Sequence, residues 1–288
     1  TRSIKMLWRS FARKACCSCA HPMNLQLVVK ASCALTAGKP SFFITMTCNP
    51  AWDEIQHSLL PGQTARDRPD IVSRVFKKKL DELIRELTAD GILGKTVAHL
   101  FVVEFQKRGL PHAHILLILH SRDRPKSADD IDGLVRAELP SDDEKPQRSD
   151  FESEEKYVEA LKQFKELRRI VEECMLHREC GRANPLAPCM KNGCCEKFFP
   201  KDFQSATTWN ELEIYPRYRR RSPSDGGAEY LITERSGRSR VVNNSWVVPY
   251  NPYLALKYKC HINVEVCISV ASVKYLCAAA AVRVHMCV

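Results

Sequence analysis

The sequence has no long uncharged apolar run and no recognisable secretory signal peptide. A helix that spans a membrane needs about 20 consecutive apolar residues, so we expect no transmembrane span. Without a signal peptide, we do not expect secretion. The chain begins with Thr1 rather than Met, and nothing at its carboxyl end supplies a natural stop, so we expect a fragment with altered ends.

Cysteine, in contrast, is abundant, with 14 residues in a chain of 288. In a protein that is not secreted, such cysteines indicate metal ligands and buried thiols rather than a disulfide framework. The net charge of +10 and the pI near 9.0 favour a polyanionic partner, for which nucleic acid is the natural candidate. The length allows one sizeable core or two smaller domains.

The clearest local pattern is that of a β-hairpin. β-Branched and aromatic residues are frequent over 97–106, and a second apolar run covers 114–119. Gly109 and Pro111 between the two runs favour a turn. We therefore predict two antiparallel strands joined by a short loop.

This hairpin would bring potential metal ligands to one surface. Side chains two residues apart share a face of a strand, so Glu104 and Gln106 face the same way, as do His112 and His114. A three-residue loop would place Gln106 opposite His112 and Glu104 opposite His114, and a one-residue slip would destroy that convergence. Two imidazoles and a carboxylate suit Mg²⁺, Mn²⁺ or Zn²⁺; the alternative is a strand with two ordinary polar side chains.

Two further elements frame the hairpin. Residues 41–48 read as a buried strand that Asn49-Pro50 closes, and Pro69 is well placed to open a helix that runs to Gly91. The segment Gly94-Lys95-Thr96 fits a relaxed phosphate-loop pattern, but a helix rather than a strand precedes it. We therefore favour a helix stop followed by a turn.

A second group of ligands follows a charged stretch that ends in a predicted helix over 157–175. The close pair His177 and Cys180, followed by Cys189 and Cys195, has ordinary spacing for a tetrahedral zinc ion, and Cys194 competes with Cys195 for the last position. The alternative is a set of buried reduced thiols, but the intervening loops rich in glycine and proline offer little core. We predict structural zinc, with no open position for catalysis.

A basic segment with interleaved aromatic residues comes next. It can neutralise phosphates while its rings stack on unpaired bases, and a solvated edge strand is the equally weighted alternative. The same run is also a weak nuclear-targeting signal. The predicted DNA-binding residues are Arg217, Tyr218, Arg219, Arg220 and Arg221.

Together these motifs resemble the Rep domain of Helitron transposases, a member of the broader HUH endonuclease group. The similarity runs from about Gly38 to Leu276. Its anchors are Phe43-Ile-Thr-Met-Thr-Cys-Asn-Pro50, the Glu104 to His114 segment, the predicted zinc ligands, and Pro249-Tyr-Asn-Pro-Tyr253 through His261-Ile-Asn-Val-Glu265.

The resemblance implies an antiparallel sheet with the two histidines on a central strand, helices on one face and a nucleophilic tyrosine on a later helix. If the family's ligand roles apply to this sequence, His112 and His114 bind Mg²⁺ or Mn²⁺. Glu104 is then the third ligand, and Gln106 is its competitor or close neighbour. An anionic oxygen suits a hard cation better than an amide does. Tyr275 would attack a phosphate of single-stranded DNA, giving a 5′-phosphotyrosine link and a free 3′-hydroxyl that primes replication or accepts strand transfer.

The sequence departs from the family pattern near its end. The family continues with a Lys and a second Tyr three and four residues after the first, where this chain has Ala278 and Ala279. Residues before about 36 do not follow the family, and the helicase region is absent from this chain. We expect a truncated copy that is either a nicking endonuclease with one tyrosine or a catalytically dead, zinc-stabilised remnant that binds nucleic acid.

We therefore expect an α+β protein with an HUH-like antiparallel sheet, a small zinc-binding insertion and a nuclear location. The expected segments are an irregular amino-terminal part (1–36), the core with the metal hairpin (37–122), a charged insertion with a helix (123–176), the zinc segment (177–200), a basic segment (201–249) and the truncated tyrosine helix (250–288).

Overall fold

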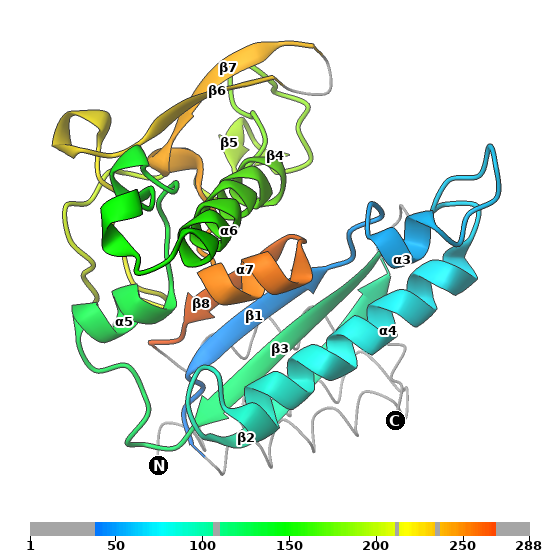
Figure 1. The fold of residues 1–288 in the computed structure, drawn as a ribbon, viewed down its shortest axis with the longest axis horizontal. Coiled ribbons are helices and arrows are strands. Elements are labelled where there is room, and N and C mark those ends of the chain that lie inside the picture. Colours follow the sequence, from blue (N-terminus) through cyan, green and yellow to red (C-terminus); the bar gives the residue numbers. More distant parts are fainter. Residues whose placement is uncertain (1–37, 106–109, 211–212, 234–236, 269–288) are drawn as a thin grey trace.

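A computed structural model describes residues 38–105, 110–210, 213–233 and 237–268, and it is a mixed α/β structure built on an antiparallel sheet (Figure 1). The sheet has four strands in the order β2, β3, β1, β8, and all neighbours are antiparallel. The strand bounds are Phe42–Thr47 for β1, Thr96–Phe105 for β2, Pro111–Leu119 for β3 and Ile262–Val266 for β8. The predicted fold class is confirmed.

Alternation along the strands gives the sheet two different faces. On β1, Phe42, Ile44 and Met46 have no exposed surface, and they point to the face that the helices cover. Thr45 and Thr47 point the other way, to the face that carries the side chains of His112 and His114 on β3. The period of two therefore separates an apolar core from a polar site on the same strands.

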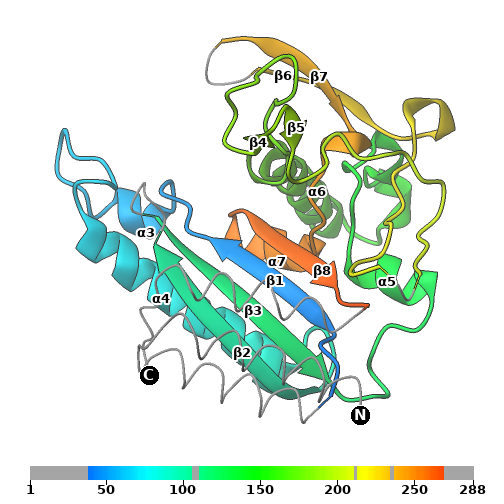
Figure 2. The same ribbon diagram turned by 180° about the vertical axis from the view of Figure 1, so that it is seen from behind.

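Helices α4 (Pro69–Arg85) and α7 (Pro252–Tyr258) lie on one face of the sheet, as both ribbon views show (Figures 1 and 2). Pro69 occupies the first turn of α4, where its missing N–H costs no helical hydrogen bond. The chain then continues through a π-helical turn, η1 (Glu86–Asp90), and ends it at Gly91 with a φ of 65°. This helix stop leads directly into β2, so the Gly94-Lys95-Thr96 segment follows a helix and enters a strand.

The remaining elements form a second layer beside the sheet (Figure 1). Its helices are α5 (Ala128–Leu134), η2 (Asp142–Glu144), η3 (Arg148–Asp150), α6 (Glu154–Cys174), η4 (Pro223–Asp225) and η5 (Asn244–Trp246), and its strands are β4 (Met190–Lys191), β5 (Cys194–Cys195), β6 (Glu229–Thr233) and β7 (Ser239–Asn243). The short helix α3 (Asp53–Gln56) lies instead beside α4. Helix α6 confirms the helix predicted over 157–175. Its amino terminus lies earlier, because Ser153 accepts a capping hydrogen bond from the backbone N–H of Lys156.

The charged stretch 123–176 contributes to the core. Ile131 and Val135 from its first half, and Ile170 and Val171 from α6, are buried with the sheet residues in one hydrophobic cluster. Residues 252–266 also belong to the main fold, because α7 covers the sheet and β8 pairs with β1.

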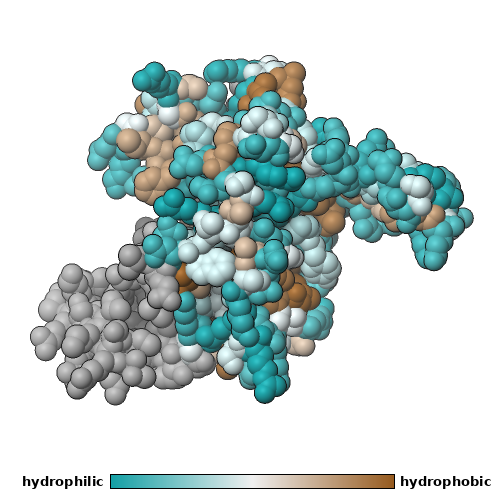
Figure 3. Space-filling model, turned by 90° about the vertical axis from the view of Figure 1, so that its left-hand side faces the viewer, coloured by the Kyte–Doolittle hydropathy of each residue, from teal (hydrophilic) through white to brown (hydrophobic). Residues whose placement is uncertain are grey.

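The molecular surface drawn in Figure 3 is largely hydrophilic, with small scattered hydrophobic areas. Among the described residues, no helix combines the length and apolar character that crossing a bilayer requires. The described cysteines, eight in all, are free thiols.

Candidate functional site

The metal hairpin forms, with a register that differs from the prediction. Glu104 pairs with His112, and Val102 pairs with His114, so the pairing is shifted by two residues from the predicted one. The prediction was wrong because it placed only three residues in the loop, whereas β2 ends at Phe105 and β3 begins at Pro111. A shift of two preserves the face of every side chain, so Glu104 still shares a surface with both histidines.

Threonine hydroxyls on β1 hold both imidazoles. Thr45 Oγ1 lies 3.0 Å from His114 Nδ1, and Thr47 Oγ1 lies 3.0 Å from His112 Nδ1. With Nδ1 engaged in this way, Nε2 is the nitrogen that each ring can offer to a metal ion. The prediction missed these threonines, although their spacing of two in a predicted strand placed them on one face.

Both imidazoles are neutral near pH 7. Burial, together with smaller effects of the neighbouring imidazoles of His114 and His261, lowers the pKa of His112 to about 4. Burial also lowers the pKa of His114, while the Glu104 carboxylate acts in the opposite direction. A neutral imidazole has the lone pair that metal coordination needs.

The donor set suits a divalent ion in its chemistry, with two imidazole nitrogens and one carboxylate. Glu104 Oε2 lies 3.5 Å from His114 Nε2, so these two groups meet. The ring of His112 lies on the same face, but the ligand atoms of Glu104, His112 and His114 are not all close to one another. Among the described residues, the compact group of potential metal ligands lies elsewhere. Gln106 and Tyr275 lie outside the described residues, so their predicted roles stay predictions.

The compact set is the predicted zinc group: His177, Cys180, Cys189 and Cys195. Their ligand atoms all lie within 4.8 Å of one another, and Cys195 Sγ is 3.5 Å from His177 Nε2. With Zn–S near 2.3 Å and Zn–N near 2.0 Å, a tetrahedral site has ligand separations of roughly 3.5–3.8 Å. The four residues therefore form a cluster that could hold a metal ion such as zinc.

A tight hairpin brings two of these cysteines together. Strands β4 and β5 are joined by Asn192 and Gly193, which have φ values of 50° and 79°. Asn-Gly is the pair that favours positive φ at both central positions of a two-residue hairpin. Cys195 pairs with Met190, next to Cys189, while Cys194 is exposed and lies outside the cluster. Of the two cysteines, Cys195 is the one that the structure brings into the cluster.

Burial and hydrogen bonds shift the pKa values of the cysteine thiols in this cluster. The backbone N–H groups of Phe199 and Lys197 donate to Cys195 and lower its pKa against the opposing effect of burial. Burial and the neighbouring thiols instead raise the pKa of Cys180 to about 12. Metal binding requires thiolates, so occupancy of this site would release protons.

The zinc cluster is anchored to the rest of the fold through His177. Its ring stacks on Phe199 at 4.2 Å between centroids and on Trp246 at 6.4 Å. Its backbone N–H donates to the Trp246 carbonyl at 2.8 Å. Just before it, the carbonyl of Cys174 lies 2.8 Å from Nδ1 of His261, which precedes β8. The cluster is therefore attached to the edge of the sheet.

The basic segment is mostly structural, which corrects the prediction for two of its residues. Tyr218 is 5 % exposed, and its hydroxyl accepts the backbone N–H of Val266. Arg220 is 4 % exposed, and it donates to the carbonyls of Ala137, Asn244 and Val247. Stacking on bases and phosphate neutralisation need accessible side chains, so the burial of these two is incompatible with the predicted role.

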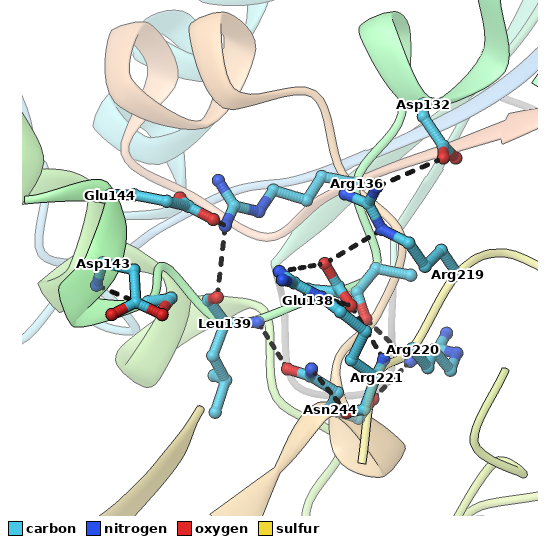
Figure 4. Close-up of polar contacts among 12 residues, drawn as sticks. Asp132, Arg136, Glu138, Leu139, Asp143, Glu144, Arg219, Arg220, Arg221 and Asn244 are labelled. Atoms are coloured by element: carbon cyan, nitrogen blue, oxygen red, sulfur yellow. Dashed lines mark hydrogen bonds and ion pairs between the residues drawn. The ribbon is translucent and has the colours of Figure 1, made fainter. Parts of the chain in front are cut away.

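Two neighbouring arginines converge on one buried carboxylate (Figure 4). Arg221 contacts Glu138 through its backbone N–H at 2.7 Å and through its guanidinium at 2.9 and 3.0 Å, and Arg219 lies 3.3 Å from the same carboxylate. Arg217 is exposed and pairs with Glu213 at 2.9 Å. Sequence alone gives no sign of Glu138, which lies about 80 positions earlier.

Comparison with known proteins bears on the first half of the fold. No curated protein matches the chain. A family model does match residues 20–117, which include β1, α4, β2 and most of β3. Its description is the Helitron helicase-like domain at the N-terminus, so the chain carries a Helitron helicase-like region over these residues, and the predicted Helitron resemblance is confirmed there.

Proposed function

We propose that this chain is a Helitron-type Rep endonuclease that nicks single-stranded DNA with a divalent metal ion. The observation that carries the proposal is the placement of Glu104, His112 and His114 on one face of a central hairpin, inside the segment that matches the Helitron family model. The position of the histidines on an interior strand supports an HUH-like arrangement. A nuclear location follows from a DNA substrate.

In this proposal, the Thr45 and Thr47 hydroxyls fix the imidazoles while Glu104 supplies the negative charge. Glu104, His112 and His114 would hold Mg²⁺ or Mn²⁺, which would supply Lewis-acid polarisation of the scissile phosphate. The phenolic oxygen of Tyr275 bonds to phosphorus, the bond to the 3′-oxygen breaks, and the phenolic proton is balanced by protonation of that 3′-oxygen. The products are a 5′-phosphotyrosine link and a free 3′-hydroxyl.

The test is formation of a covalent adduct on single-stranded oligonucleotides of randomised sequence that carry a 3′ fluorophore. With Mn²⁺ or Mg²⁺, the label should move with the protein in denaturing electrophoresis. We expect Tyr275→Phe to abolish the adduct, and His112→Ala or His114→Ala to reduce it by about 100-fold or more, on the scale of losing a main catalytic element. The zinc-loaded protein without added Mn²⁺ or Mg²⁺ is the control.

An adduct that persists in Tyr275→Phe would exclude the proposed nucleophile. Absence of an adduct in every metal condition, together with salt-sensitive DNA binding, would instead identify a catalytically dead, zinc-stabilised remnant. The specific observation that favours this second candidate is Ala279, which stands where the family has its second tyrosine.

A further inference from the structure

The turn that closes the zinc cluster presents an exposed aromatic side chain. The backbone N–H of Phe198 donates to the Cys195 carbonyl at 2.9 Å. The backbone N–H groups of its neighbours Lys197 and Phe199 donate to the Cys195 sulfur. Phe199 turns inward onto His177, whereas Phe198 points outward and is 77 % exposed. One face of this turn therefore stabilises the cluster, and the other presents a phenyl ring to solvent.

The conformation of Phe198 is unfavourable for its residue type. Its φ is 56°, in the left-handed region that suits glycine and is rare for bulky side chains. Burial of the ring does not compensate for this cost, because most of its surface is exposed. Residues with strained backbone conformations are frequent at ligand-binding positions. We therefore consider a ligand-binding role for the Phe198 ring.

Positive charge accompanies the ring. Lys201 Nζ lies 5.6 Å from the Phe198 ring centroid and 5.2 Å from that of Phe199, and Lys197 is exposed beside them. A phenyl ring and two lysine side chains therefore lie together on this turn.

An exposed aromatic ring with lysine side chains close to it suits an unpaired nucleotide. Aromatic rings stack on bases of any sequence once those bases are unpaired, and lysine contacts the phosphates. A duplex offers no free base face for the ring. The buried Tyr218 and Arg220 cannot supply these contacts.

We propose that Phe198 and Lys197 form a binding site for single-stranded DNA, in which the Phe198 ring stacks on an unpaired base and Lys197 contacts the adjoining phosphate. This inference rests on the proposed function for its choice of DNA as the ligand.

The test measures binding rather than cleavage. Full-length, zinc-loaded protein without Mg²⁺ or Mn²⁺ is titrated against a short fluorescent oligothymidylate, and anisotropy is followed. We expect Phe198→Ala to weaken binding by about 5- to 100-fold, from the usual contribution of one stacked base, while Phe198→Trp keeps it. Leu186→Ala, which removes a side chain that is 93 % exposed on the same zinc segment, should leave the affinity unchanged.

Glycine at the same position separates a binding role from a structural one. Phe198→Gly removes the backbone cost of a φ of 56°, so the thermal midpoint should rise while the DNA affinity falls. Lys197→Gln should reduce the slope of log affinity against log salt by about 0.7, the value for one contact to a single strand. Unchanged affinity in Phe198→Ala, or joint loss of stability and affinity in Phe198→Gly, would overturn the inference.

The outcome is independent of the nicking experiment. Weakened binding by Phe198→Ala, with no covalent adduct from any form of the protein, would support this site and reject the endonuclease proposal. A normal adduct from the wild type, with unchanged binding by Phe198→Ala, would reject this site alone.

Discussion

At the scale of single residues, the least obvious members of the candidate metal site are two hydroxyls. Thr45 and Thr47 lie 3.0 Å from the Nδ1 atoms of His114 and His112. Groups that contact the outer nitrogen of a metal-binding histidine fix its tautomer and its orientation. In the proposed metal site, the two hydroxyls would therefore contribute to metal affinity without contacting the metal.

We expect Thr45→Val and Thr47→Val each to weaken Mn²⁺ binding by about 10- to 100-fold, the usual effect of losing such a partner. Valine keeps the shape of threonine and removes only the hydrogen bond. Calorimetric titration of Mn²⁺ into zinc-loaded protein measures the change. Thr45→Ser and Thr47→Ser, which keep the hydroxyl, serve as matched controls, and equal losses in the serine and valine forms would assign the effect to packing instead.

Residue patterns predicted the hairpin and its face, but they did not fix its register. Alternation places Glu104, His112 and His114 on one side for any shift by an even number of residues. The loop length decides between such registers, and Gly109 indicates a turn without fixing its length as an Asn-Gly pair would.

At the scale of elements, the zinc segment was predictable because its ligands lie close together in sequence. Asn192-Gly193 is a strong local turn signal, and it positions the cysteines of the hairpin without help from the rest of the fold. The basic segment is the opposite case. Its arginines contact Glu138 and carbonyls far away in the chain, and a local run of charges cannot reveal partners that only the tertiary structure supplies.

We expect purified protein to contain about one equivalent of zinc, and Cys180→Ser or Cys189→Ser to lose it and to unfold at a lower temperature, because structural zinc contributes directly to folding. Elemental analysis and thermal melts measure both effects. Cys194→Ser is the matched control, since this exposed neighbour lies outside the cluster. Equal zinc in all three variants would rule out the assigned ligands.

At the scale of the whole molecule, Glu138 joins distant parts of the chain. Its side chain is 2 % exposed and forms ion pairs with Arg219 and Arg221 of the basic segment (Figure 4). The backbone carbonyl of the same residue accepts a hydrogen bond from Tyr250, which precedes α7. The second layer and the sheet region are therefore fastened to each other around one buried carboxylate.

We expect Glu138→Gln to destabilise the fold by about 2–4 kcal/mol, because it leaves two arginines without their buried anionic partner. Hydrogen bonds and charge from Arg221 and Arg219 hold the pKa of Glu138 below its ordinary value of 4.5, despite burial. A carboxyl whose pKa is lowered in the fold stabilises it above the unfolded pKa, and that contribution disappears as the pH falls through the folded pKa. The stability gap between wild type and variant should thus be full at pH 7 and shrink below about pH 4.5.

Denaturant unfolding at several pH values measures this gap, and Glu154→Gln is a suitable control. Glu154 also contacts an arginine, Arg148 at 2.6 Å, but its side chain is 63 % exposed. Solvent screens such a pair, so we expect its loss to change stability by less than about 1 kcal/mol. If Glu138→Gln behaved like Glu154→Gln, or if its gap persisted unchanged into acid, the arginines would hold their places without the carboxylate.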